Sequence, residues 1–230
     1  MNLARLFPRR RNSAAPALPE PQALDSTPLN IARLVVLDLE TTGLNVQRAN
    51  ILSIGAVAVN RGAILMADQF ERTVYNADHQ ANDATVLHEM APSVIQQGQP
   101  ATEALKDFLG YADTSVLLAF HAGFDEGMLK RALRKELDYQ LQHRFLDIAE
   151  IARMVFPAAA AECTSLDDWQ RHFHLTNSER HNASADAQVT AEILLILLNR
   201  LAKQGTNTLA ELNNRLSAWR RLNKVRSARL

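Results

Sequence analysis

Several features are scarce in this sequence of 230 residues, and each scarcity narrows the range of folds. Cys163 is the only cysteine, so no internal disulfide can form, and a reducing compartment such as the cytoplasm is expected. No run of about 18 apolar residues occurs, so no membrane span is predicted. Hydrophobic residues make up 47% and charged residues 22%, which excludes a wholly disordered chain and favours one domain with a sizeable core.

Net charge is also absent, but the charged residues are unevenly distributed. Residues 1–28 contain four basic and two acidic side chains, whereas residues 212–230 contain six basic and no acidic ones. The residues between these segments carry 15 basic and 23 acidic side chains. Such an acidic body would repel a phosphate chain unless metal ions and the basic segments offset its charge.

Composition divides the chain into three parts. Residues 1–28 contain five prolines and four arginines and predict a flexible leader. The leader shares its Arg-rich, acid-poor character with organelle transit peptides, although Pro8 interrupts any amphipathic helix. We expect the main domain over residues 29–204 and a basic helical segment over residues 205–230.

Hydrophobic periodicity predicts an α/β fold with a mixed sheet. Three strands, ending near residues 39, 59 and 75, should form an antiparallel meander, and residues 115–120 and 144–148 predict two more strands. Helices are expected over residues 102–112, 123–137, 148–155, 165–173 and 183–202, with a last one from residue 209. The apolar run over residues 193–198 predicts that its helix is buried against the sheet.

The first predicted strand ends in two carboxylates, Asp38 and Glu40. Side chains at positions i and i+2 of a strand share a face. Because apolar residues flank the pair, both carboxylates should point into one partly buried place, where their repulsion calls for a hard cation. The simpler interpretation is a pair of polar residues on the solvated face of an edge strand.

Two further carboxylates begin predicted helices. Asp125 follows Gly123 at a junction from strand to helix, where the helix dipole should keep it ionised. Asp186 lies in the first turns of the long apolar helix, faces inward if Val189 does, and then needs a partner. His181 precedes it on a predicted loop. Each residue alone could be an ordinary helix acid or loop histidine, but together they indicate one site.

The order of these motifs resembles that of the DEDD exonuclease superfamily in its histidine-containing branch, which includes the proofreading subunit of bacterial replicative DNA polymerase. D-x-E follows a first strand, F-D opens a helix in mid-chain, and H-x-x-x-x-D comes near the end. The resemblance covers residues 34–201. It implies a ribonuclease H-like fold, a mixed five-stranded sheet flanked by helices, in which two divalent cations, Mg²⁺ or Mn²⁺, are held. The implied metal ligands are Asp38, Glu40, Asp125 and Asp186, and the implied general base is His181.

The resemblance also implies substrate contacts. Thr41, Thr42, Gly43 and Leu44 match the family segment that holds the terminal nucleotide. Family members commonly show H-N-A-x-F-D in the second motif, whereas this chain has Phe120 and His121 in the first two places. The change leaves the metal ligand in place and affects the neighbourhood of the substrate, where His121 and Phe124 are expected to make contact.

The implied activity is a 3′-5′ exonuclease that releases nucleoside 5′-monophosphates from single-stranded or frayed DNA, in proofreading or repair, with a DNA polymerase subunit as a candidate partner. An exoribonuclease that trims RNA ends is an alternative, because no residue is identified that reads a 2′-hydroxyl. A non-catalytic nucleic-acid-binding or polymerase-tethering module with the same fold is another. The presence of all five site residues argues against the non-catalytic module.

Overall fold

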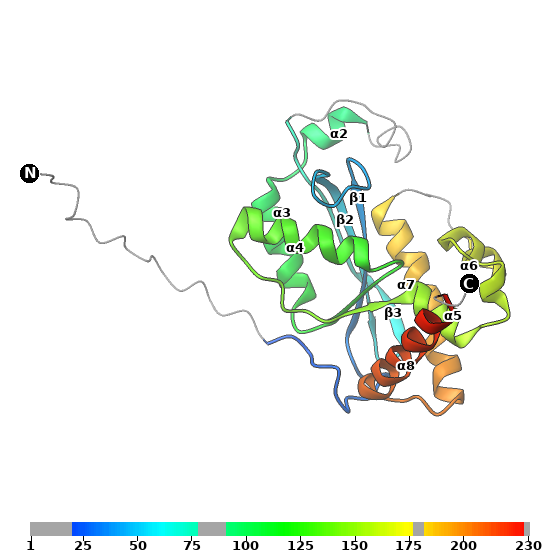
Figure 1. Ribbon diagram of the computed structural model, residues 1–230. Coiled ribbons are helices and arrows are strands. Elements are labelled where there is room, and N and C mark those ends of the chain that lie inside the picture. Colours follow the sequence, from blue (N-terminus) through cyan, green and yellow to red (C-terminus); the bar gives the residue numbers. More distant parts are fainter. Residues whose placement is uncertain (1–19, 78–90, 177–181, 228–230) are drawn as a thin grey trace, which may run out of the picture.

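A five-stranded mixed sheet forms the centre of the protein (Figure 1). The computed structural model describes residues 20–77, 91–176 and 182–227. The strands are ordered β3-β2-β1-β4-β5; β1, β2 and β3 are antiparallel neighbours, whereas β4 and β5 run parallel to β1. Their bounds are Leu34–Thr41, Ile51–Asn60, Ala63–Thr73, Val116–Ala119 and Phe145–Asp147 in chain order. The predicted meander and mixed sheet are confirmed.

The turn between β2 and β3 shows why these strands pair directly. Arg61 and Gly62 have φ angles of 52° and 71°. Positive φ at both central residues is the backbone of a two-residue type I′ hairpin, whose twist matches that of the strands on either side. The turn thereby fixes the register in which β3 adds to the edge of the sheet.

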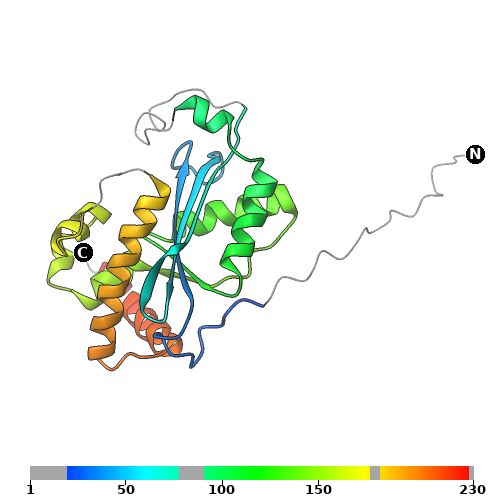
Figure 2. The ribbon, with the colours of Figure 1, turned by 180° about the vertical axis from the view of Figure 1, so that it is seen from behind.

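Helices cover both faces of the sheet (Figure 2). Helices α3 (Ala101–Ala112) and α4 (Gly123–Leu137) pack on one face. The other face is covered by α5 (Ile148–Val155), α7 (Ala183–Lys203) and α8 (Leu209–Ser227). Two short helices, α2 (Pro92–Gln96) and α6 (Leu166–His172), and a 3₁₀ turn at Ala159–Ala161 complete the described elements. Among the described residues, no helix has the length and apolar character needed to cross a membrane.

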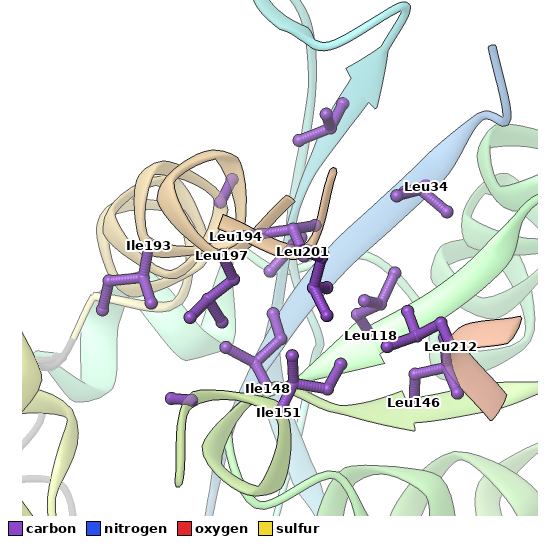
Figure 3. Packing of buried hydrophobic residues seen from close by; sticks show 14 of the residues in the cluster. Leu34, Leu118, Leu146, Ile148, Ile151, Ile193, Leu194, Leu197, Leu201 and Leu212 are labelled. Carbon is purple, nitrogen blue, oxygen red and sulfur yellow. The ribbon is translucent and has the colours of Figure 1, made fainter. Parts of the chain in front are cut away.

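Both faces of the central strand β1 are buried, and its alternation assigns each side chain to one of two cores. Val35, Leu37 and Leu39 pack with α3 and α4. Leu34 and Val36 pack in the opposite core, where Leu34 lies among residues of β4, β5, α5, α7 and α8 (Figure 3). Asp38 and Glu40 continue the even-numbered series and therefore lie on the α7 side of the sheet.

The apolar run of α7 is buried on one side only. Ile193, Leu194 and Leu197 are fully buried, whereas Leu195, Ile196 and Leu198 are half-buried. The prediction of burial against the sheet is thus right for one stripe of the run. The difference arises because α7 lies on the surface of a single sheet, which covers one side of a helix.

Residues 1–19, most of the predicted leader, fall outside the described residues. The described residues from 20 onward contact the domain: Gln22 N–H donates to the carbonyl of Thr114 at 2.7 Å, and Leu29 N–H donates to the carbonyl of Asn207 at 2.8 Å. Leu209 and Leu212 of α8 are buried in the same core as Leu29.

Candidate functional site

Three carboxylates meet at the end of β1. Asp38, Glu40 and Asp186 each place one carboxylate oxygen within 4.8 Å of the others. Glu40 and Asp186 are buried, with 4% and 5% of their surfaces exposed, and Asp38 is half-buried. An all-oxygen donor set of this kind suits a hard divalent cation such as Mg²⁺ or Mn²⁺ better than zinc, which prefers nitrogen and sulfur ligands. The three residues therefore fit the metal site that the sequence implied.

Gly55 is the reason that α7 can deliver Asp186 to this point. It pairs with Asp38 across the β1-β2 ladder. A Cβ atom at this position would lie 2.1 Å from the carbonyl carbon of Ala183 and 2.3 Å from the nitrogen of Ser184. The first turn of α7 therefore rests directly on the backbone of β2. Our sequence reasoning missed Gly55, although an isolated glycine inside a strand signals a close backbone approach.

The start of α7 is fixed by a cap. The side chain of Asn182 accepts a hydrogen bond from the backbone N–H of Ala185 at 3.0 Å, and its carbonyl accepts from the N–H of Asp186 at 2.9 Å. Asparagine is among the favoured N-cap residues because its short side chain satisfies an otherwise unpaired amide. The cap and the contact with Gly55 together set the position of the Asp186 carboxylate.

Asp125 differs from the prediction in its charge. It lies in the first turn of α4, is 5% exposed and is not one of the three carboxylates that meet within 4.8 Å. Its pKa is raised to about 8, mainly by burial and to a smaller extent by the nearby Asp147 and Glu40, while hydrogen bonds from the backbone, including that of Leu39, lower it. The expectation that the helix dipole keeps Asp125 ionised is wrong for the metal-free protein, because burial outweighs the dipole.

Asp147 is a fifth acidic residue that the sequence reasoning did not identify. It ends β5 and caps α5, where its side chain accepts a hydrogen bond from the backbone N–H of Glu150 at 3.1 Å. Burial raises its pKa; the hydrogen bond from the Glu150 backbone lowers it, the negative charge of Glu150 raises it, and His121 lowers it. An acid just before an apolar helix is a recognisable N-cap signal, but its closeness to Asp125 depends on the neighbouring positions of β4 and β5.

The predicted substrate segment forms a loop that three hydrogen bonds hold in place. Thr42 N–H donates to the carbonyl of Asn50, and Asn50 N–H donates to Thr42 Oγ1, both at 2.9 Å. Thr41 Oγ1 donates to the carbonyl of Gly43 at 3.0 Å. Leu44 is 88% exposed at the tip. The loop thus presents an apolar side chain on a stiff support, which suits contact with a nucleotide.

The other predicted contacts lie at the start of α4 or outside the described residues. His121 is exposed, has a φ angle of 61°, and its ring lies 4.7 Å from that of Phe120. Phe124 is half-buried against the core that contains α3 and α4. His181 falls outside the described residues. Roles for these three residues remain predictions.

Comparison with known proteins identifies a shared family and shared relatives. The model of an exonuclease family, RNase_T, matches residues 35–194. DNA polymerase III PolC-type of Thermotoga petrophila is 27% identical over 80% of this chain and 13% of its own length. A protein of Mycobacterium tuberculosis, provisionally named a bifunctional exonuclease/endonuclease, is 33% identical over 84% of this chain and 30% of its own length. The chain thus spans less than a third of the length of these relatives.

Solved structures share the fold. Exonuclease I of E. coli in complex with a dT13 oligonucleotide aligns with a TM-score of 0.63 and 13% identity, over 75% of this chain and 42% of that one. Exonuclease X in complex with 5′ overhanging duplex DNA aligns with a TM-score of 0.58 and 19% identity, over 72% of this chain and 91% of that one. The predicted ribonuclease H-like fold is confirmed.

Proposed function

Because the chain belongs to the RNase_T exonuclease family, we propose that it is a metal-dependent 3′-5′ exonuclease that removes nucleoside 5′-monophosphates from single-stranded or frayed DNA. The observation that carries the proposal is the meeting of Asp38, Glu40 and Asp186 within 4.8 Å at the end of the central strand. Two of the three carboxylates are buried, and such a grouping is stabilised by cations.

The residues around the cluster have distinct parts in this reaction. Asp38, Glu40 and Asp186 would hold divalent cations, and Asp125, whose pKa the nearby Glu40 raises, would join them. When bound, the cations supply Lewis-acid activation and charge stabilisation for the displacement at phosphorus. His181 would accept the proton of the attacking water, since a histidine near its ordinary pKa is neutral at pH 7.

The loop after β1 and the start of α4 would bind the substrate. Exposed Leu44 would pack against the terminal nucleoside, while the hydrogen bonds between Thr42 and Asn50 keep the loop in place. His121 and Phe124 lie just before Asp125 and would contact the same end of the strand. Fixing the reacting group in this way lowers the entropic part of the barrier.

The choice of DNA rests on the relatives, and that of the 3′ end rests on the resemblance of the motifs to the DEDD exonuclease superfamily. PolC-type DNA polymerase III is similar to most of this chain, and the matching exonuclease I and X structures hold DNA. The same similarity supports a DNA polymerase as a partner. A non-catalytic module is less well supported, because it would not need three carboxylates at one point.

The test uses 5′-labelled single-stranded DNA and RNA of the same sequence, with Mg²⁺, with Mn²⁺ and with EDTA. We expect a ladder that shortens from the 3′ end on DNA, requires a cation and disappears in Asp186→Asn. Glu192→Gln, a change of the same charge six residues further along α7, should keep the ladder. A ladder that persists in Asp186→Asn, or no ladder with either cation, would refute the proposal, and faster cleavage of RNA would make the protein an exoribonuclease.

A further inference from the structure

A cavity of about 230 Å³ with both polar and apolar lining residues lies beside the loop that follows β1. It is bounded by α3, α4, the start of β2 and the residues that follow β3. Its polar lining comes from Asn50, Tyr75, Asn76, Arg131, Lys135 and Glu136. The sequence reasoning assigned no function to these residues, and none of them belongs to the carboxylate cluster.

Arg131 is the unusual member of this lining. Its Nε atom is buried and has no hydrogen-bond partner within the part of the chain that the structure describes. Nη1 donates one long hydrogen bond, 3.5 Å, to the carbonyl of Gln47. The guanidinium group thus has few acceptors, so a ligand in the cavity that brings negatively charged oxygen atoms to its Nη atoms would stabilise it.

The rest of the cavity adds an ion pair and an aromatic ring. Lys135 Nζ lies 2.9 Å from Glu136 Oε1 in a pair whose lysine side chain is 65% exposed. The charges of Lys135 and Glu136 cancel, so the net positive charge of the lining is that of Arg131. Tyr75 is 47% exposed, which leaves part of its ring available for stacking.

The cavity is coupled to the proposed active site through α4 and the loop. Arg131 follows Asp125 by six residues on α4, which is about 9 Å along the helix axis. Asn50 lines the cavity and holds Thr42 through two hydrogen bonds. A ligand in the cavity would therefore lie close to a strand whose 3′ end occupies the site.

We propose that this cavity binds a nucleotide, with Arg131 and Lys135 on its phosphate and Tyr75 against its base. The cavity is smaller than the ~300–1,000 Å³ of pockets for drug-sized ligands, which suits one nucleotide rather than a longer segment. The inference rests on the proposed function, because an exonuclease encounters nucleotides in two forms. One is an internal nucleotide of the bound strand, and the other is the free mononucleotide that the enzyme releases.

The experiment measures binding to the full chain in EDTA, so that hydrolysis does not interfere. The probes are dTMP, titrated by calorimetry, and a 5′-fluorescein-labelled (dT)₈, followed by anisotropy. The variants are Arg131→Gln, Lys135→Gln and the control Arg134→Gln, which removes the same charge from an exposed position of α4 outside the cavity. Thermal melting of each variant shows that it is folded.

We expect Arg131→Gln to weaken binding of at least one probe by about tenfold or more. Lys135→Gln, at an exposed and paired position, should have an effect of about two- to threefold, and Arg134→Gln a smaller one. An effect on dTMP identifies the free nucleotide as a ligand, and an effect on (dT)₈ alone identifies the bound strand.

Equal affinities of Arg131→Gln and Arg134→Gln for both probes would overturn the proposal and mean that the cavity holds only water. If Arg131→Gln does not fold, Lys135→Gln decides: affinities equal to those of Arg134→Gln for both probes would equally overturn it. The 5′-labelled DNA ladder is run in parallel with Mg²⁺. If the ladder forms but neither substitution changes nucleotide binding, the proposal for the cavity is rejected and the proposed exonuclease activity stands. If the substitutions weaken binding but no ladder forms, the cavity binds a nucleotide and the proposed exonuclease activity is rejected.

Discussion

The substitution Gly55→Ala tests whether the position of α7 is needed for activity, because it should move the helix without changing any of the carboxylates. The added Cβ would lie 2.1 Å from the carbonyl carbon of Ala183, whereas ordinary contacts begin at 3.4 Å. The Cβ is fixed by the backbone of β2, and the carbonyl belongs to the backbone of α7, so neither can rotate away. Helix α7 must therefore move away from the sheet by more than about 1 Å. Overpacking of a core typically costs about 1–3 kcal/mol, which for a domain of this size lowers the melting temperature by roughly 2–12 °C.

The effect on activity should exceed the effect on folding. A displacement of 1 Å at a reacting group can reduce the rate by about 10²-fold, and Asp186 moves with the helix. We expect a lower kcat at temperatures well below the melting transition, together with weaker Mn²⁺ binding, both measured on wild type and variant under the same conditions.

Gly110→Ala is the matched control. Gly110 lies exposed in α3, and nothing is within 4 Å of a Cβ built there. The same substitution should therefore stabilise the helix by about 0.5–1 kcal/mol and leave kcat unchanged. Wild-type stability and wild-type kcat in Gly55→Ala would refute the conclusion that close backbone contact positions Asp186.

Three further predictions concern titratable groups. The pKa of Asp125 is about 8 in the folded protein and 3.8 as a free side chain, so in EDTA the protein should lose stability as pH rises from about 4 to 8. Thermal melts of Asp125→Asn should show a weaker dependence of stability on pH, and an unchanged dependence would contradict the raised pKa. His181→Ala should lower kcat by about 10²–10⁴-fold with Mn²⁺ affinity unchanged; weaker Mn²⁺ binding would instead make His181 a ligand. Burial lowers the pKa of His143 below 6.5, so stability should fall as pH drops below about 6.5, and His143→Asn should reduce that loss in urea titrations at pH 5 and 7.5.

The parts of the fold that the sequence predicted are those set by local rules. The bounds of α5 and α6 were predicted closely from periodicity, and both helices begin at local N-caps: Asp147 caps α5, and Ser165 forms a capping box with Asp168 at the start of α6. The turn at Arg61 and Gly62 is likewise local. Each of these signals needs only a few neighbouring residues.

What the sequence did not reveal depends on contacts between distant segments. Gly55 and Ala183 are far apart in the chain and meet only because α7 crosses β2 at that point. The raised pKa of Asp125 needs the burial and the neighbours that the folded sheet supplies. Asp147 could be read as a helix cap but not as a neighbour of Asp125, since that requires the order of the strands.

The order of the strands explains why the acidic residues converge. β1, β4 and β5 are parallel, so their carboxyl ends lie at the same edge of the sheet. Glu40 lies near the end of β1, Asp125 in the helix that follows β4, and Asp147 at the end of β5. Asp186 reaches this edge from the other direction, at the start of α7.

Three helices therefore begin at one edge, and their free N–H groups carry partial positive charge toward the carboxylates. Each dipole contributes typically 0.3–1 kcal/mol near the surface, which is less than the cost of burying an unpaired carboxylate. Burial accordingly raises the pKa of both Asp125 and Asp147 despite their places at helix N-termini. The helices reduce the repulsion at this edge without removing it, and the remaining negative charge would favour the binding of a divalent cation that we propose for Asp38, Glu40 and Asp186.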